Sequence, residues 1–168
     1  MFEEIIEQLN RCKVKYLVVG GIAVNLHGFY RATEDLDIIL LLSSSNIKKF
    51  IKAVKNLKLV PRVPVKIDDF ANKDLRMMWI KDKNMKAFTF YDPDYQRKYL
   101  DVVIDHPVNF EKAYKSKSVY KDGTLGVPVI PITDLIKMKK AALRERDKID
   151  IKGLRLAQEM RREEKRSK

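Results

Sequence analysis

The sequence has one cysteine and no long apolar run, and each shortage excludes a class of protein. Cys12 is the single cysteine, so the chain cannot form an internal disulfide. Its fold must be stabilised by a hydrophobic core, as in proteins of a reducing compartment. The longest apolar run, residues 38–42, is far shorter than the roughly 20 residues that cross a bilayer. The N-terminal MFEEIIEQLN is acidic and amphipathic, unlike a signal peptide. We therefore expect a soluble cytoplasmic protein without a membrane partner.

Histidine and tryptophan are also scarce. The two histidines, His27 and His106, lack the spacing to Cys, His or Asp that a zinc site or a catalytic triad needs, so we interpret both as packing or surface residues. Trp79, Phe88 and Phe90 are interpreted as core residues, because no aromatic RNA-binding motif surrounds them. The sequence thus favours neither a zinc enzyme nor an aromatic RNA-binding domain.

Positive charge, in contrast, is abundant. The chain carries 35 Lys and Arg against 23 Asp and Glu, a formal net charge of +12. Residues 137–168 alone contain 13 basic and 6 acidic side chains. Such a field attracts polyanions such as RNA or nucleotide phosphates, and we expect the C-terminal segment to face an acceptor or its phosphates. The alternative is a solvated, lysine-rich surface with no specific partner.

The length of 168 residues suits one domain, and 45% apolar residues are enough for a core. The periodicity predicts an α+β (α/β-like) fold, in which helices flank a mixed sheet and the C-terminal end is helical. Strands are expected at residues 16–19, 35–42, 86–91, 99–104, 118–120 and 127–130. Helices are expected at residues 2–11, from Gly21 to Gly28, from the serines at 43–45 to residue 57, and at residues 68–80, 110–114, 133–143 and 147–162.

The helix patterns also predict individual side chains. In the helix at residues 68–80, Phe70, Leu75, Met78 and Trp79 are expected to turn inward. Thr133 is expected to cap the following C-terminal helix. The last six residues, EEKRSK, are expected to fray.

Two aspartates stand together in the predicted strand at 35–42. Residues two apart in a strand point to the same side, so Leu36 and Ile38 would face the core and Asp35 and Asp37 the opposite face. Adjacent anions repel, and a bound Mg²⁺ would remove that conflict. The alternative is a pair of acids facing solvent on an edge strand.

A Gly20–Gly21 pair lies where the strand at 16–19 ends and a helix begins. Glycine lets the backbone approach a ligand closely, and a helix N-terminus attracts phosphate. The alternative is an ordinary tight turn.

Asp101 lies between Leu100 and Val102 in another predicted strand, and Asp105 is a rival for the same role. If this strand lies beside the first, three carboxylates converge, which is the ligand set of a two-metal site.

These motifs together resemble those of the DNA polymerase beta-like nucleotidyltransferases. Their pattern of a hydrophobic residue, Gly, and Gly or Ser, then Asp–hydrophobic–Asp, fits Val19–Gly20–Gly21 and Asp35–Leu36–Asp37–Ile38, which thirteen residues separate. Leu100–Asp101–Val102 fits the later strand with the third carboxylate. Arg31-x-Thr33-x-Asp35 and the ending DLIKMKKAALRERDKID resemble small prokaryotic members related to abortive-infection toxins and minimal nucleotidyltransferases.

The resemblance implies a metal-dependent transfer of a nucleoside monophosphate from a nucleoside triphosphate to a hydroxyl acceptor. It assigns Asp35, Asp37 and Asp101 to catalysis and to Mg²⁺ or Mn²⁺. Nucleotide binding would fall to Gly20, Gly21, Arg31, Thr33 and Lys139. Residues 1–168 would form one nucleotidyltransferase domain, with a catalytic core at about 15–130 and a helical part at about 131–163.

Several alternatives stay open at this stage. Arg31 and Thr33 can equally well cap the loop, and Lys139 can be a solvated lysine beside Lys137 and Lys140. Three residues of the last motif are expected to form an ion network that fixes the last helix: Arg146, Asp147 and Asp150. The acceptor can be RNA, a protein or a small molecule, for example within a toxin–antitoxin pair. The alternative functions are a non-catalytic, antitoxin-like partner of a ribonuclease toxin, or a basic RNA-binding module without a metal.

Overall fold

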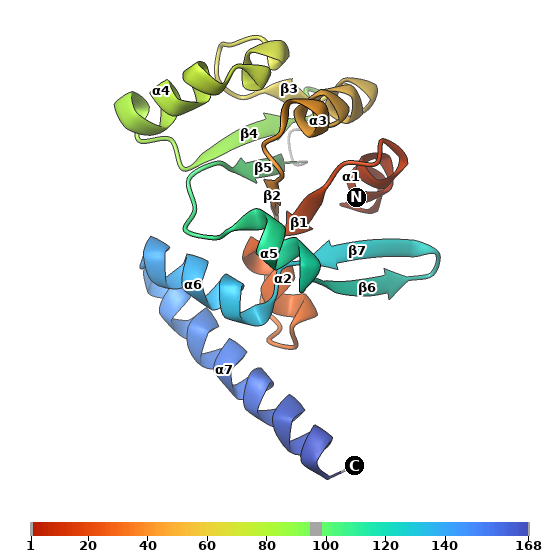
Figure 1. Cartoon of the computed structure of the whole chain (residues 1–168), viewed down its shortest axis with the longest axis vertical. Helices are drawn as coiled ribbons and strands as arrows, with labels where there is room; N and C mark the ends of the chain where they lie inside the picture. Colours follow the sequence, from red (N-terminus) through yellow and green to blue (C-terminus); the bar gives the residue numbers. More distant parts are fainter. Residues whose placement is uncertain (1, 95–98, 168) are drawn as a thin grey trace.

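The computed structural model describes residues 2–94 and 99–167, and it contains one mixed β-sheet flanked by helices (Figure 1). The sheet has seven strands in the order β3-β4-β5-β2-β1-β7-β6. Its strands are β1 (Tyr16–Val18), β2 (Leu36–Leu40), β3 (Val60–Pro61), β4 (Ala87–Tyr91), β5 (Tyr99–Val103), β6 (Ser118–Asp122) and β7 (Leu125–Val129). The predicted α+β class with a mixed sheet is confirmed.

The helices surround this sheet and form the C-terminal end. They are α1 (Phe2–Arg11), α2 (Gly20–Leu26), α3 (Ser44–Asn56), the 3₁₀ helix η1 (Ile67–Ala71), α4 (Lys73–Lys83), α5 (Phe110–Lys115), α6 (Ile132–Ala142) and α7 (Glu145–Arg166). Among the described residues, no helix combines the length and apolar character that crossing a membrane requires.

The centre of the sheet brings distant segments into register. β1 pairs antiparallel with β2 and parallel with β7, and β2 pairs parallel with β5. The β2–β5 register places Asp37 directly opposite Asp101. On the far side of β5, β4 pairs antiparallel and places Thr89 opposite Asp101. Three polar residues therefore stand in one row across adjacent strands.

An aromatic core packs on the face of the sheet opposite this row. Phe88 and Phe90 of β4 contact Phe50 of α3, Phe70 of η1 and Trp79 of α4, with ring centroids 5.0–5.5 Å apart. All five rings are buried. Because side chains alternate along a strand, burying the phenylalanines of β4 turns Thr89 to the other face.

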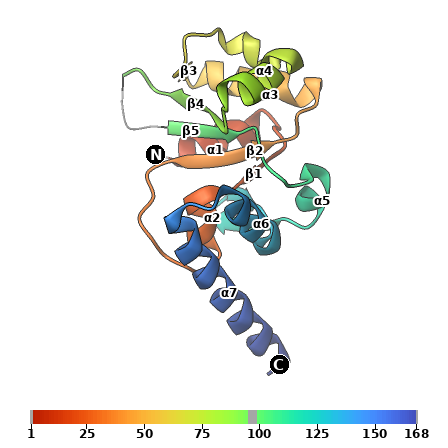
Figure 2. The same cartoon turned by 90° about the vertical axis from the view of Figure 1, so that its left-hand side faces the viewer.

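The two C-terminal helices lie on that other side of the sheet, and α7 projects away from the body of the protein (Figures 1 and 2). The start of α7 packs closely, because the ring of Phe29 lies directly against Gly153, where a Cβ atom would overlap it. Leu154 beside it is fully buried, whereas Leu156 and Met160 farther along are exposed.

The helix predicted at residues 68–80 is interrupted. It divides into η1 and α4, because the side chain of Asn72 caps α4 by accepting hydrogen bonds from the backbone of Asp74 and Leu75. The break changes the buried face. Met78 is 40% exposed, so its predicted inward position is wrong, and Arg76 is buried instead, with its guanidinium donating to the carbonyl of Phe70 at 2.6 Å.

Two predictions about the C-terminal helices are also wrong. α6 begins at Ile132 after Pro131, so Thr133 lies inside the helix and does not cap it. α7 continues to Arg166, so the segment expected to fray is helical over Glu163–Arg166. The short strand β3 had no sequence signal, since a two-residue strand containing Pro61 carries no periodicity.

Asn46 provides a test of how the sheet is tied to α3. Its buried side chain accepts a hydrogen bond from Lys15 N at 2.7 Å and donates to the carbonyls of Lys15 and Leu41 at 2.9 Å. We expect Asn46→Ala to lower the free energy of unfolding by about 2–4 kcal/mol in urea denaturation, because three partly buried backbone groups each lose a hydrogen bond. The control Asn56→Ala, exposed on the same helix, should change it by less than about 0.5 kcal/mol. Equal effects of the two changes would contradict this role.

Candidate functional site

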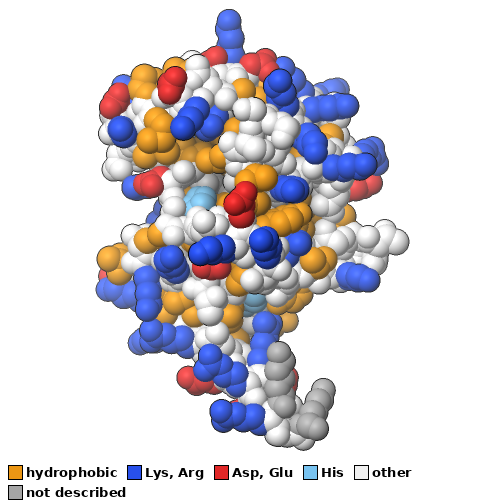
Figure 3. All heavy atoms as spheres, viewed as in Figure 1, with side chains coloured by type: hydrophobic (Ala, Val, Ile, Leu, Met, Phe, Trp, Pro, Cys, Tyr) orange, Lys and Arg blue, Asp and Glu red, His pale blue; other side chains and the backbone are white. Residues whose placement is uncertain are grey.

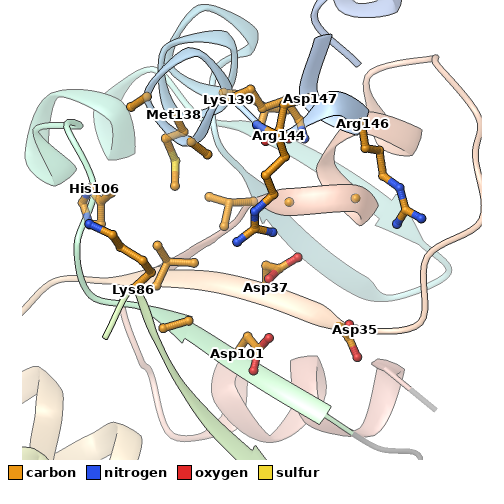
Figure 4. A pocket seen from close by; sticks show the side chains of 18 of the residues that line it. Asp35, Asp37, Lys86, Asp101, His106, Met138, Lys139, Arg144, Arg146 and Asp147 are labelled. Carbon is orange, nitrogen blue, oxygen red and sulfur yellow. Dashed lines mark hydrogen bonds and ion pairs between the residues drawn. The ribbon is translucent and has the colours of Figure 1, made fainter. Parts of the chain in front are cut away.

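A cleft of about 770 Å³ lies between the polar face of the sheet and the helices α2 and α6, with the start of α7 at its side (Figure 4). One part of its wall is charged and the other is largely apolar. The charged part includes Gly20, Gly21, Arg31, Thr33, Asp35, Asp37, Asp101, Lys139, Arg144, Arg146 and Asp147. The remaining part includes Lys86, Ala87, Val103, Asp105, His106, Pro107, Leu135, Met138, Ala141 and Ala142. All eight residues singled out from the sequence therefore line one cleft.

Three carboxylates enter this cleft from neighbouring strands. Asp37 and Asp101 lie opposite each other on β2 and β5, and Asp35 directly precedes β2 (Figure 4). Burial and then the charges of Asp101 and Asp35 raise the pKa of Asp37 to about 6. Burial also raises the pKa of Asp101, to which Asp35 adds, while a hydrogen bond from Thr89 opposes the rise. Asp37 and Asp101 thus lie in an electrostatic field, to which the charge of Asp35 contributes, that disfavours their ionisation.

The residues present fit a hard divalent cation. Oδ1 of Asp101 is buried and has no hydrogen-bond partner within the described part of the chain, an arrangement that normally destabilises a fold. Carboxylate oxygens are the ligands that Mg²⁺ and Mn²⁺ prefer. Among the described residues, no three His, Cys, Asp or Glu side chains are already grouped as a complete metal site.

The Gly20–Gly21 turn lies against the carboxylates. Gly20 has φ +61°, and a Cβ atom there would overlap the carboxylate of Asp37. A Cβ on Gly21 would collide with the side chain of Thr33 and lie 2.9 Å from Nη2 of Arg31. The Gly21 N–H donates to Asp37 and lowers its pKa, against the larger effect of burial. Only glycine fits this turn, and its backbone is open to the same cleft as the acids.

A buried ion network supports the turn from the C-terminal helices. Asp150, fully buried on α7, accepts from Nε of Arg31 at 2.9 Å and from Nζ of Lys139 at 2.6 Å. Lys139 also donates to Asp147 at 3.1 Å. The interpretation of Lys139 as a solvated surface lysine is wrong, since the residue is 6% exposed. Asp147 and Asp150 join the network as expected, whereas Arg146 lines the cleft and has no ion pair among the described residues.

Arg144 is the residue that sequence reasoning missed. It is the residue before α7, and its side chain reaches across the cleft toward Asp37 (Figure 4). Its charge lowers the pKa of Asp101, against the stronger effect of burial. No local pattern distinguishes Arg144 from the other basic residues nearby, because only the turn between α6 and α7 aims it into the cleft.

Asp105, the rival third carboxylate, has a different setting. It follows β5, is exposed, and forms an ion pair with Lys86 at the other end of the cleft. His106 beside it also lines the cleft, and its Nδ1 accepts a hydrogen bond from the backbone N–H of Val108 at 3.3 Å. His27 is buried between the carbonyl of Ile130 and the hydroxyl of Tyr120 and does not line the cleft. The geometry thus favours Asp101 over Asp105.

The chain is similar to known nucleotidyltransferases in sequence family and in fold. The family model described as "Nucleotidyltransferase of unknown function (DUF6036)" matches residues 1–164. No curated protein sequence matches the chain. The lincomycin-bound structure of the lincosamide antibiotic adenylyltransferase LnuA is 18% identical, with a TM-score of 0.57 over 90% of this chain and 92% of that chain. The structure of ANT(2'')-Ia in complex with adenylyl-2''-tobramycin is 12% identical, with a TM-score of 0.54 over 93% of this chain and 84% of that chain.

The raised pKa of Asp37 predicts how stability depends on pH in metal-free buffer. Between pH 4 and pH 6 the folded protein binds more protons than the unfolded chain, so the free energy of unfolding should fall as pH rises. Because the pKa of Asp37 is about 6 in the folded protein against an ordinary 3.8, the free energy of unfolding should fall by roughly 2–3 kcal/mol over this range. Asp37→Asn should remove most of the decline, measured by urea denaturation from pH 4 to pH 7.5. A decline of the same size in Asp37→Asn would show that other groups cause it.

Proposed function

Because the chain belongs to the nucleotidyltransferase family whose model it matches over residues 1–164, we propose that it transfers a nucleoside monophosphate from a nucleoside triphosphate to a hydroxyl acceptor in this cleft. The observation that carries the proposal is the pairing of Asp37 with Asp101 beside the Gly20–Gly21 turn. Oδ1 of Asp101 is buried there and has no hydrogen-bond partner among the residues that the structure describes. Residues 15–130 would be the catalytic core and residues 131–163 the helical part that closes the cleft, within one domain.

Asp35, Asp37 and Asp101 would hold Mg²⁺ or Mn²⁺, which supplies positive charge to the polyphosphate and to the reacting phosphorus. The backbone N–H groups of the Gly20–Gly21 turn would bind the triphosphate, because the turn leaves room for phosphate oxygens. Arg31 and Thr33 flank the turn and are suited to the same group. Lys139 acts through its charge, which lowers the pKa of Asp37 and so favours the ionised, metal-binding form of that carboxylate.

In the proposed reaction, the acceptor oxygen forms a bond to the α-phosphorus while the bond to the β-phosphate oxygen breaks, and pyrophosphate leaves. Asp101 accepts the proton of the attacking hydroxyl. Its raised pKa makes it a stronger base than an ordinary aspartate, and Thr89 fixes its orientation by a hydrogen bond. Most of the rate would come from positioning and from charge stabilisation.

We propose a small organic molecule as the acceptor. The cleft has the size of small-ligand sites, and the part of its wall away from the Gly20–Gly21 turn is largely apolar, with Val103, Leu135 and Met138. LnuA and ANT(2'')-Ia, which share the fold, were solved with lincomycin and with adenylyl-2''-tobramycin. An RNA or protein hydroxyl, in a toxin–antitoxin pair for example, would be a different outcome of the same assay.

The assay supplies each α-³²P-labelled nucleoside triphosphate with Mg²⁺ to the wild-type protein, together with a lysate fractionated into small molecules, RNA and protein. We expect label in the small-molecule fraction. Label in RNA or protein would replace the proposed acceptor class. The absence of transfer, together with nucleotide binding that is equally strong with and without metal in calorimetry, would contradict the proposed function and favour a non-catalytic, antitoxin-like or RNA-binding role.

Asp101 separates binding from chemistry. We expect Asp101→Ala to keep nucleoside triphosphate binding within about fivefold and to lower kcat by about 100-fold or more, because the missing interaction forms in the transition state. Asp105→Ala is the matched control and should change kcat by less than about threefold, because Asp105 is paired with Lys86. If Asp105→Ala is inactive and Asp101→Ala is not, the third carboxylate has been misassigned.

Arg144 should bind the triphosphate. We expect Arg144→Ala to raise the Kd of the nucleoside triphosphate about 10-fold in calorimetry, the loss of one charge-assisted hydrogen bond. Arg144→Lys should restore part of the affinity. The control Arg155→Ala removes an exposed arginine of α7 that does not line the cleft, and it should leave Kd unchanged. Equal losses in Arg144→Ala and Arg155→Ala would indicate an effect of net charge alone.

A further inference from the structure

The solvent face of α3 and the segments beside it carry a dense group of lysines on the other side of the sheet from the cleft. We call this group the α3 lysine surface. It consists of Lys13, Lys15, Lys48, Lys49, Lys52 and Lys58, all of them exposed. In Figure 3, Lys and Arg side chains gather over the upper right of the molecule, where Figure 1 places α3. The cleft uses none of these residues.

The segments that carry this surface contain no acidic residue. Residues 38–67 contain no Asp or Glu, and neither do residues 8–33. Lys55, the remaining lysine of α3, forms an ion pair with Asp68 at 2.8 Å. The six lysines of the surface have no ion pair with any acid in the described part of the chain. Their positive potentials therefore add, and the surface can neutralise a partner's charges.

The surface is also rigid. The opposite face of α3 is buried through Ile47, Phe50 and Val54. The side chain of Asn46 forms hydrogen bonds with the backbone N–H and the carbonyl of Lys15. These bonds hold the segment that precedes β1 against the start of α3. Lys48 and Lys52 are one turn apart on this helix, about 6 Å along its axis. The positive charges are therefore held at spacings set by the fold, although each lysine stem is free.

The chemistry of the exposed residues decides between two polyanions. The solvent face of α3 carries only Ser44, Ser45, Lys48, Lys49, Lys52, Lys55 and Asn56. A helix that inserts into a membrane interface needs large apolar or aromatic side chains next to its lysines, and this face has none. Lysines alone suit phosphate groups, which they contact as point charges without reading bases.

We propose that the α3 lysine surface binds the phosphodiester backbone of nucleic acid, independently of sequence. The surface works independently of the cleft, because it lies across the sheet from Asp37 and Asp101 and requires no nucleotide. It would hold the protein on a nucleic acid while the cleft acts on its own substrates.

The test measures fluorescence anisotropy of a labelled RNA duplex and of a DNA duplex of the same sequence, with the full chain and without nucleotide, from about 50 to 200 mM salt. The variant Lys48→Glu/Lys49→Glu/Lys52→Glu reverses three charges of the surface. The control Lys152→Glu/Arg155→Glu/Arg162→Glu reverses three exposed charges of α7 and so has the same net charge. Melting temperature and nucleotide affinity should match wild type in both variants, which separates this test from the proposed function.

We expect the wild type to bind, with the affinity falling steeply as salt rises. The α3 variant should bind at least about 10-fold more weakly than the control, and the slope of log K against log salt should decrease by about three. A milder variant, Lys48→Gln/Lys49→Gln/Lys52→Gln, should show the same reduction in slope. Preference between the two duplexes identifies RNA or DNA as the source of the phosphodiester.

Three outcomes would overturn the proposal. The first is equal weakening in the α3 variant and the control, which would leave only an effect of net charge. The second is a wild-type protein that binds neither duplex. The third is binding to phosphatidylserine vesicles by the wild type, lost in the α3 variant, with no binding to either duplex.

Discussion

The parallel pairing of β2 with β5 is the constraint on which the site depends. It places Asp37 opposite Asp101, and neither strand is free to shift, because the other face of both is fully buried through Leu36, Ile38, Leu100 and Val102. A shift of either strand by one residue would turn its own carboxylate into that core. The hydrophobic effect thus holds two like charges together, and the cost appears as a raised pKa at each acid. The fold creates a requirement for positive charge at one point, and the rest of the cleft is arranged around that point.

The second structural support is electrostatic and comes from the C-terminal helices. Asp150 bonds Arg31 from the loop before β2 and Lys139 from α6, so one fully buried carboxylate joins three parts of the chain. A buried charge is tolerated when its partners compensate it, and here two cations do so. The network fixes the loop that carries Thr33 against Gly21, and with it the shape of the Gly20–Gly21 turn.

Local patterns in the sequence predicted much of the site. The alternation at Asp35–Ile38 placed two carboxylates on the face away from the core, and the Gly20–Gly21 pair marked the turn beside them. The convergence with Asp101 came from resemblance, because no local pattern shows that two strands more than sixty residues apart lie side by side.

The same limit hid the burial of Lys139, since its partners lie on another helix. Arg144 escaped notice for a related reason: its direction depends on how α6 turns into α7. Met78 was misplaced because Asn72 ends one helix and caps the next, which changes the phase of the buried face.

The contacts that complete the cleft are among the most distant along the chain. Arg31 bonds Asp150 across 119 residues. Closing such long loops costs entropy before the contacts can form, so the cleft should be among the last parts of the molecule to assemble during folding. During synthesis, a nascent chain whose Asp150 has not yet left the ribosome would already contain the carboxylates of β2 and β5 but would lack the support for Arg31. The loop that carries Arg31 would therefore gain its support well after the carboxylates of β2 and β5 have been synthesised.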